Sequence, residues 1–239
     1  MSVESKVEKA IRRLAALGDG TIRRHALAEI VATESPEVGC GLLARIVSDS
    51  LARRASGAAL MITLAQLLAV GPFPYAVASE IYGVAKVAGF SLVTGLMVGC
   101  IVREPEDEPR TSLAHFTLGE RRALARRPTP HAIEKLLVDP DPIVIRNLLN
   151  APRLTEREVV KIAAARTTSA RVLLEILKSR RFGNREHVRI AVARNPRTPF
   201  AVALSVLPSL DSRAIAEIAR DPSANEALRV AARTIFSSS

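Results

Sequence analysis

Aromatic side chains are scarce in this sequence, and tryptophan is absent. Six Phe and two Tyr account for 3% of the 239 residues. Proteins that bind single-stranded nucleic acid stack bases on aromatic side chains, and enzymes that extrude a base hold it between aromatic or apolar groups. The scarcity of aromatic faces therefore argues against recognition of bases and against a base-extruding repair enzyme.

Cysteine is also rare, with Cys40 in "VGCGLL" and Cys100 in "MVGCIV". Both lie in apolar surroundings, which is typical of a small buried side chain rather than of a disulfide. A chain of this length buries enough apolar surface to fold without disulfides or metals. We therefore expect two reduced, buried thiols and a cytoplasmic protein.

No uncharged segment is long enough to form an uninterrupted membrane-spanning helix. The run 55–79 contains Pro72 and Pro74, so its continuous helix ends near Val70 after about sixteen residues, short of the roughly twenty that a bilayer requires. The run 87–102 is equally short. Two buried core helices are therefore favoured, and a membrane hairpin is the alternative. The amino-terminal segment alternates charged and apolar residues, so we expect no secretory signal.

The sequence lacks a recognisable catalytic or metal-binding constellation. No histidine has a second metal ligand at the usual spacing, and the four lie in separate predicted helices or repeats. They are His25, His115, His131 and His187. No glycine-rich phosphate loop joins a strand to a helix, and no serine lies in a nucleophile elbow. We expect a non-catalytic protein with no cofactor and no metal.

The net charge of +10 is carried by the C-terminal half. Residues 1–118 contain 12 Lys/Arg and 12 Asp/Glu, whereas residues 119–239 contain 22 and 12. The segment 103–112, "REPEDEPRTS", is dense in charge and proline, which is typical of an exposed linker or long loop. We predict an N-terminal helical part at 1–102, this linker, and a basic helical part at 113–239. The alternative is that both parts pack as one continuous body.

A short phrase recurs in the second half, and each copy is predicted to end a helix. The copies are "LARRP" at 124–128, "LLNAP" at 148–152, "AARTT" at 164–168, "VARNP" at 192–196 and "IARDP" at 218–222. Proline stops a helix because it cannot continue the hydrogen-bond ladder, and it suits the first helical position. The prolines therefore separate successive helices, and the sequence predicts an all-α protein.

Capping residues support these helix boundaries. Asp141 precedes Pro142, so the pair is suited to cap and begin a helix. Thr155 and Glu158 have the spacing of a capping box. Asp211 or Ser212 is placed to cap the helix that follows.

The stretch "ALARRPTPHAIEKLLVDPDPIVIRNLLNAPRLTEREVVKIAAARTTSARVLLEI" resembles the leucine-rich repeat variant, a bacterial relative of HEAT-type α-solenoids. The resemblance extends over about residues 119–236 and rests on repeat pattern rather than on a catalytic signature. It implies a right-handed α-solenoid, a superhelical stack of helical repeats. Some members carry an iron–sulfur cluster, but two cysteines sixty residues apart cannot ligate one alone, so we expect none here.

Arginine recurs within the repeated phrase. Arg126, Arg166, Arg194 and Arg220 take the same position in four copies, and Asn150 takes it in the second. With residues of the adjoining turns, the predicted arginine edge consists of Arg126, Arg127, Arg166, Arg194, Arg197 and Arg220, with Arg153 and Arg171 nearby. The simpler interpretation, which we favour, is structural, because cations stabilise the carbonyl end of a helix and pair with neighbouring acids.

A second basic cluster lies in "KSRRFGNREHVR". Its Lys178, Arg180, Arg181 and Arg185 are candidates to contact phosphates or an acidic partner. Solvated loop charge is the commoner explanation of such a run.

These features favour a non-catalytic scaffold whose basic repeats bind another macromolecule, most readily a protein with an acidic surface. The alternative is binding to the backbone of DNA or RNA through the arginine edge.

Overall fold

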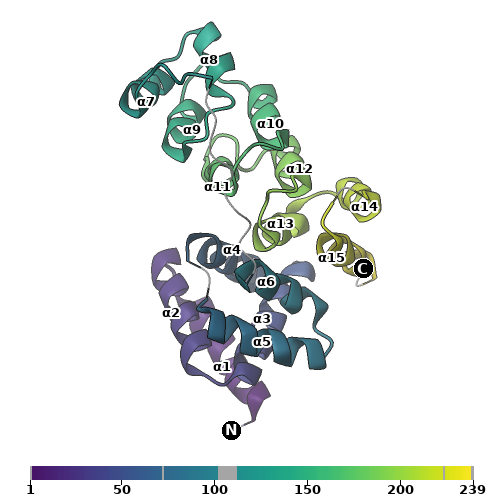
Figure 1. Cartoon of the computed structure of the whole chain (residues 1–239). Helices are drawn as coiled ribbons and strands as arrows, with labels where there is room; N and C mark the ends of the chain where they lie inside the picture. The colour runs from purple at the N-terminus through teal and green to yellow at the C-terminus, as the bar shows by residue number, and fades with distance from the viewer. Residues whose placement is uncertain (1, 72, 102–111, 223, 238–239) are drawn as a thin grey trace. The chain divides into compact units, whose positions relative to one another are not determined.

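The structure is a computed structural model that describes residues 2–71, 73–101, 112–222 and 224–237. All regular secondary structure in these ranges is helical, which confirms the predicted all-α class. The chain divides into two compact units (Figure 1): unit 1 is Met1–Arg103 with Pro199–Ser239, and unit 2 is Glu104–Thr198. Of the predicted linker 103–112, only Ser112 lies within the described residues.

Unit 1 contains the six helices of the N-terminal part and the last helices of the chain. They are α1 (Val3–Ala16), α2 (Gly20–Thr33), α3 (Pro36–Leu51), α4 (Ala55–Val70), α5 (Tyr75–Val87), α6 (Ser91–Ile101), α13 (Phe200–Val206), the 3-10 helix η1 (Leu207–Ser209), α14 (Ser212–Arg220) and α15 (Glu226–Ser237).

Unit 2 contains six shorter helices joined by turns. They are α7 (Leu118–Arg126), α8 (Pro130–Leu136), α9 (Pro142–Leu149), α10 (Glu156–Ala164), α11 (Ala170–Lys178) and α12 (Glu186–Arg194). Their N-terminal caps agree with the sequence prediction. Asp141 accepts hydrogen bonds from the backbone N–H groups of Ile143 and Val144, and Thr155 forms the capping box with Glu158.

The long apolar helices of unit 1 lie in a helical core. α3 packs against α1, α4 and α5, and it buries Cys40 together with six large aliphatic side chains. Cys100, on α6, is also buried, so the predicted burial of both thiols is confirmed. α4 spans the predicted range Ala55–Val70. Within the described ranges, every helix is too short or too polar to cross a bilayer.

The last helices of the chain pack on the N-terminal helices. α13 lies against α4, and five of its seven residues are buried. The Arg53 guanidinium donates a 3.1 Å hydrogen bond to the backbone oxygen of Leu210. This packing differs from the predicted division, which grouped all of 113–239. The charge pattern that suggested the boundary carries no information on which apolar faces meet.

The helices of unit 2 form two rows. α9 lies between α7 and α11, and α10 lies against α12. Contacts at two points along each pair show the direction of the helices. Arg185 before α12 lies 3.8 Å from Glu156 of α10, and the Asn195 amide after α12 donates to the Ala163 oxygen near the end of α10. In the other row, Arg146 of α9 bonds Glu175 of α11, and Arg181 after α11 donates to the Ala151 oxygen after α9. Neighbours within each row therefore run parallel, and the short turns join the two rows.

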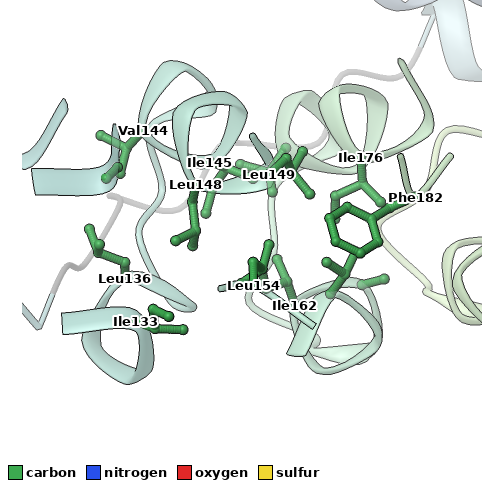
Figure 2. Close-up of a cluster of buried hydrophobic side chains, with 14 of the residues drawn as sticks. Ile133, Leu136, Val144, Ile145, Leu148, Leu149, Leu154, Ile162, Ile176 and Phe182 are labelled. Carbon is green, nitrogen blue, oxygen red and sulfur yellow. The ribbon is translucent and has the colours of Figure 1, made fainter. Parts of the chain in front are cut away.

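A continuous apolar core lies between these rows. In Figure 2 this core extends from Ile133 and Leu136 of α8, past Ile145 and Leu148 of α9, to the ring of Phe182. Side chains at three- and four-residue spacing on each short helix point inward, as expected for amphipathic helices. A nine-residue helix is marginal by itself, so this shared core is what stabilises each of them.

Candidate functional site

The excess positive charge is concentrated in unit 2. Unit 2, residues 104–198, contains 19 Lys/Arg and 12 Asp/Glu, of which residues 112–198 contribute 18 and 8, whereas residues 199–239 contain four of each. Since Pro199–Ser239 packs in unit 1, most of the excess positive charge belongs to the helices before it. Unit 2 therefore carries most of the net positive charge of the chain.

Four of the eight acids within residues 112–198 pair with cations, namely Asp139, Asp141, Glu156 and Glu175. Arg121 on α7 pairs with Asp139 at 2.8 Å, and both side chains are largely buried. Arg122 pairs with Asp141, the N-cap of α9, at 3.1 Å. These pairs join successive helices of the same row, so the acids neutralise arginines inside the row rather than the exposed ones at its edges.

Glu175 on α11 is a third such acid. It accepts a 2.7 Å hydrogen bond from Arg146 on α9 and a 3.0 Å bond from Lys178. Burial opposes ionisation and is the largest single effect on this carboxyl, but the two cations together outweigh it and lower the pKa of Glu175 below its ordinary value. The carboxylate therefore stabilises the folded unit whenever it is ionised.

We expect Glu175→Gln to lower the free energy of unfolding by about 1 kcal/mol at neutral pH. The loss is modest because the two cations that bind Glu175, Arg146 and Lys178, stay about half exposed to solvent. A group whose pKa is depressed on folding contributes stability above its unfolded pKa and loses it as the pH falls through the folded value. The penalty should therefore shrink below the ordinary carboxyl pKa of 4.5. Urea unfolding at pH 7 and pH 3 measures it, with the exposed Glu186→Gln as control. An equal penalty at both pH values contradicts this account.

The predicted arginine edge is divided among three places. Arg126 and Arg127 lie at the end of α7. Arg166, Arg194 and Arg197 lie at the ends of α10 and α12. Because the two rows run in opposite directions, these groups are at opposite edges of unit 2.

Arg220, the sixth member of the predicted edge, lies in unit 1. There it lines a shallow groove of about 470 Å³ with Ala216, Ala219, Arg233 and Phe236. This groove is lined by α14 and α15 and belongs to a different unit from the other five arginines.

The repeat register also differs from the predicted one. The Thr168 hydroxyl donates to the Ile162 oxygen, and the Thr198 hydroxyl makes the same bond to the Val192 oxygen, 2.6 Å in both cases. The equivalent turns are therefore 30 residues apart rather than 28. Arg194 is the last residue of α12, whereas Arg166 follows the C-cap of α10, so the predicted equivalence of the two is wrong.

The basic cluster 178–189 is largely structural. Arg181 donates hydrogen bonds to the backbone oxygens of Ala151, Pro152 and Leu154 at 2.8, 3.2 and 2.9 Å. Its guanidinium lies 4.7 Å from the ring centroid of Phe182, which is buried in the core that Figure 2 shows.

The other members of this cluster differ in their partners. Lys178 pairs with Glu175, and Arg185 lies 3.8 Å from Glu156. Arg180 is exposed, and within the described part of the chain it has no hydrogen-bond or ion-pair partner. Of the four predicted contacts, Arg180 is therefore the most available to a ligand.

Sequence reasoning missed the polar side chains that join the turns. Asn195 is buried, its amide donates to the backbone oxygens of Ala163 and Ala165, and its Oδ1 accepts from the N–H of Arg197. Asp139 accepts in the same way from the N–H of Asp141. The signal is an Asn or Asp directly before proline at the end of a helix, which is typical of a side chain that bonds the backbone two residues on.

Both cysteine thiols are buried in the described structure. Burial raises the pKa of Cys100 to about 11 and that of Cys40 above its ordinary value, so both thiols are protonated at neutral pH. Among the residues with described positions, no three His, Cys, Asp or Glu side chains gather to hold a metal ion.

Comparison of the chain with protein-family models, with curated proteins and with solved structures finds no match.

Proposed function

We propose that this protein is a non-catalytic scaffold whose basic unit, an α-solenoid of the kind that the repeat pattern resembles, binds an acidic protein partner. The observation that carries the proposal is the concentration of charge: residues 112–198 hold 18 basic and 8 acidic side chains, and four of these acids already pair with cations, namely Asp139, Asp141, Glu156 and Glu175. Long-range attraction of this strength favours a partner of opposite sign.

The arrangement of unit 2 supports a binding role. Parallel helices in two rows expose a series of turns at each edge, and stacked repeats commonly use such extended surfaces for recognition. The side-chain hydrogen bonds of Arg181 and Asn195 to backbone oxygens join neighbouring turns. A surface built this way keeps its charges in place before a partner arrives, which lowers the entropic cost of binding.

Binding to the backbone of nucleic acid is the second candidate, because the guanidinium group of arginine binds phosphate as well as carboxylate. The exposed, unpaired guanidinium of Arg180 and the similar positions of Arg126 and Arg127 favour it. The few aromatic residues oppose base stacking, so this candidate would involve the backbone alone.

Titration of the full-length protein against poly-L-glutamate and against a DNA duplex separates the two candidates. We expect the protein to bind poly-L-glutamate more tightly than the duplex across about 50 to 200 mM salt, with affinity falling as salt rises. Fluorescence anisotropy of the labelled polymers measures both, and poly-L-lysine serves as the control that should not bind. Tighter binding to the duplex at every salt concentration would replace the proposal by the second candidate. No binding to either polyanion at the lowest salt would contradict both.

A further inference from the structure

Three turns of unit 2 share one edge. The turns after α7, α9 and α11 lie at the C-terminal ends of parallel neighbours in one row. Each turn carries arginine: Arg126 and Arg127 in the first, Arg153 in the second and Arg180 in the third. We call these four residues the turn edge.

The turns that carry this edge are held firmly. Arg181 crosses from the third turn to three backbone oxygens of the second, and Phe182 beside it is anchored in the core. The Asn147–Arg122 hydrogen bond, 3.0 Å long, keeps α9 in register with α7. The three turns therefore present their arginines from a connected framework rather than from separate loops.

Within residues 112–198, the charges of the turn edge are not neutralised by an acidic side chain. All four side chains are exposed, and none has a hydrogen-bond or ion-pair partner among the described residues. Of the nearby acids, Glu158 caps α10 with Thr155 and Glu156 binds His187 and Arg185, whereas Glu186 on α12 stays exposed. The edge is thus a row of guanidinium groups available to anionic oxygen atoms.

The spacing of the arginine-bearing turns restricts which ligands fit the turn edge. Neighbouring packed helices have axes about 8–10 Å apart, so the three turns extend over roughly 20 Å. A polyproline II segment has three residues per turn and rises about 3.1 Å per residue, so carboxylates at every third position recur about every 9 Å. One face of such a segment therefore matches one arginine-bearing turn after another.

We propose that the turn edge binds an extended acidic polypeptide segment whose carboxylates repeat at about every third residue. The inference rests on the proposed binding function and specifies its surface and ligand. Phe182, the aromatic residue of these turns, has its ring buried in the core, so the edge offers no face for a base. Glu186, exposed in the first turn of α12, adds negative charge beside the row, which a continuous polyphosphate tolerates less well than a peptide with spaced charges.

Two triple variants of equal charge change test the surface. The turn-edge variant combines Arg126→Ala, Arg153→Ala and Arg180→Ala. The matched control combines Lys135→Ala, Lys161→Ala and Arg166→Ala, which lie near the ends of α8 and α10 at the opposite edge. The probe is a labelled peptide of Glu-Pro-Pro repeats, with a peptide of identical composition but clustered glutamates beside it. Circular dichroism verifies that both variants retain the helical fold.

We expect the turn-edge variant to bind the spaced peptide about tenfold more weakly than the unmodified protein, and the control to lose about threefold or less. The unmodified protein should also prefer the spaced peptide over the clustered one.

Equal losses in the two variants would overturn the proposed edge while leaving the binding function intact. A greater loss of peptide affinity in the control variant than in the turn-edge variant would also overturn the proposed edge. A preference for the clustered peptide, or loss of DNA binding alone in the turn-edge variant, would overturn the proposed ligand. Failure of the unmodified protein to bind poly-L-glutamate and both peptides would instead reject the proposed function.

Discussion

Gly57→Ala is expected to lower the free energy of unfolding by about 3 kcal/mol, because this position has no room for a methyl group. A Cβ on Gly57, in the first turn of α4, would lie 2.3 Å from the carbonyl carbon of Asp49 and 2.5 Å from its oxygen. Both atoms belong to the backbone of α3, which cannot rotate away as a side chain can. The first turn of α4 would have to move away from α3 and disturb the shared core of unit 1.

The matched control is Gly83→Ala in α5, where no atom lies within 4 Å of the added methyl group. Alanine is the better helix former, so this variant is expected to gain up to about 1 kcal/mol. Urea unfolding followed by circular dichroism measures both variants. Similar stability of the two would show that α4 does not approach α3 as closely as the structure places it.

Asn195→Ala is expected to cost about 3 kcal/mol in unit 2, because it removes a buried side chain that satisfies three backbone groups. The amide donates 2.7 and 2.9 Å hydrogen bonds to the oxygens of Ala163 and Ala165, and Oδ1 accepts a 2.9 Å bond from the N–H of Arg197. Alanine removes all three hydrogen bonds in a site that is only 5% exposed, and the Ala165 oxygen then keeps only its bond from the N–H of Thr168. The turns after α10 and α12 would then lose their direct link.

Asn150→Ala is the control for this prediction. Asn150 is exposed, and its amide donates one hydrogen bond to the Arg146 oxygen of its own helix, so the expected loss is below about 1 kcal/mol. Asn195→Asp separates the two roles of the buried side chain, since it keeps the acceptor for Arg197 and turns an oxygen toward the two carbonyls. We expect it to be at least as destabilising as alanine at neutral pH. Unfolding of the three variants in urea gives the comparison, and equal costs at positions 150 and 195 would refute the role of Asn195.

The helices of this protein were predictable from short-range features. The helix predicted at 55–70 is α4 with the same bounds, and the caps at Asp141 and Thr155 are those expected. Of the two candidates Asp211 and Ser212, the cap is Asp211. A cap and a proline act within one turn of helix, so their effect can be read from neighbouring residues. The burial of both cysteines was predictable for a similar reason, since each lies within an apolar run.

The candidate site was only partly predictable. Arg126, Arg127 and Arg180 were singled out by composition and repetition, but the grouping of Arg126 with Arg166 and Arg194 failed, because alternating helices end at opposite edges. The role of Arg181 depends on carbonyl groups about thirty residues earlier in the chain. No local pattern around Arg181 identifies those carbonyls, although the adjacent Phe182 and Gly183 indicate a constrained turn.

Helix boundaries, capping residues and the sign of the charge follow from the amino-acid sequence alone, because they depend on backbone sterics, hydrogen bonds within one turn and the count of ionisable groups. The membership of α13 in unit 1, the 30-residue register of the turns and the composition of the turn edge depend on which apolar faces bury one another. That choice involves residues more than a hundred positions apart, as the Arg53–Leu210 hydrogen bond illustrates. The hydrophobic effect is non-directional and stabilises many pairings of apolar helix faces to a similar extent, so only the complete tertiary packing selects among them.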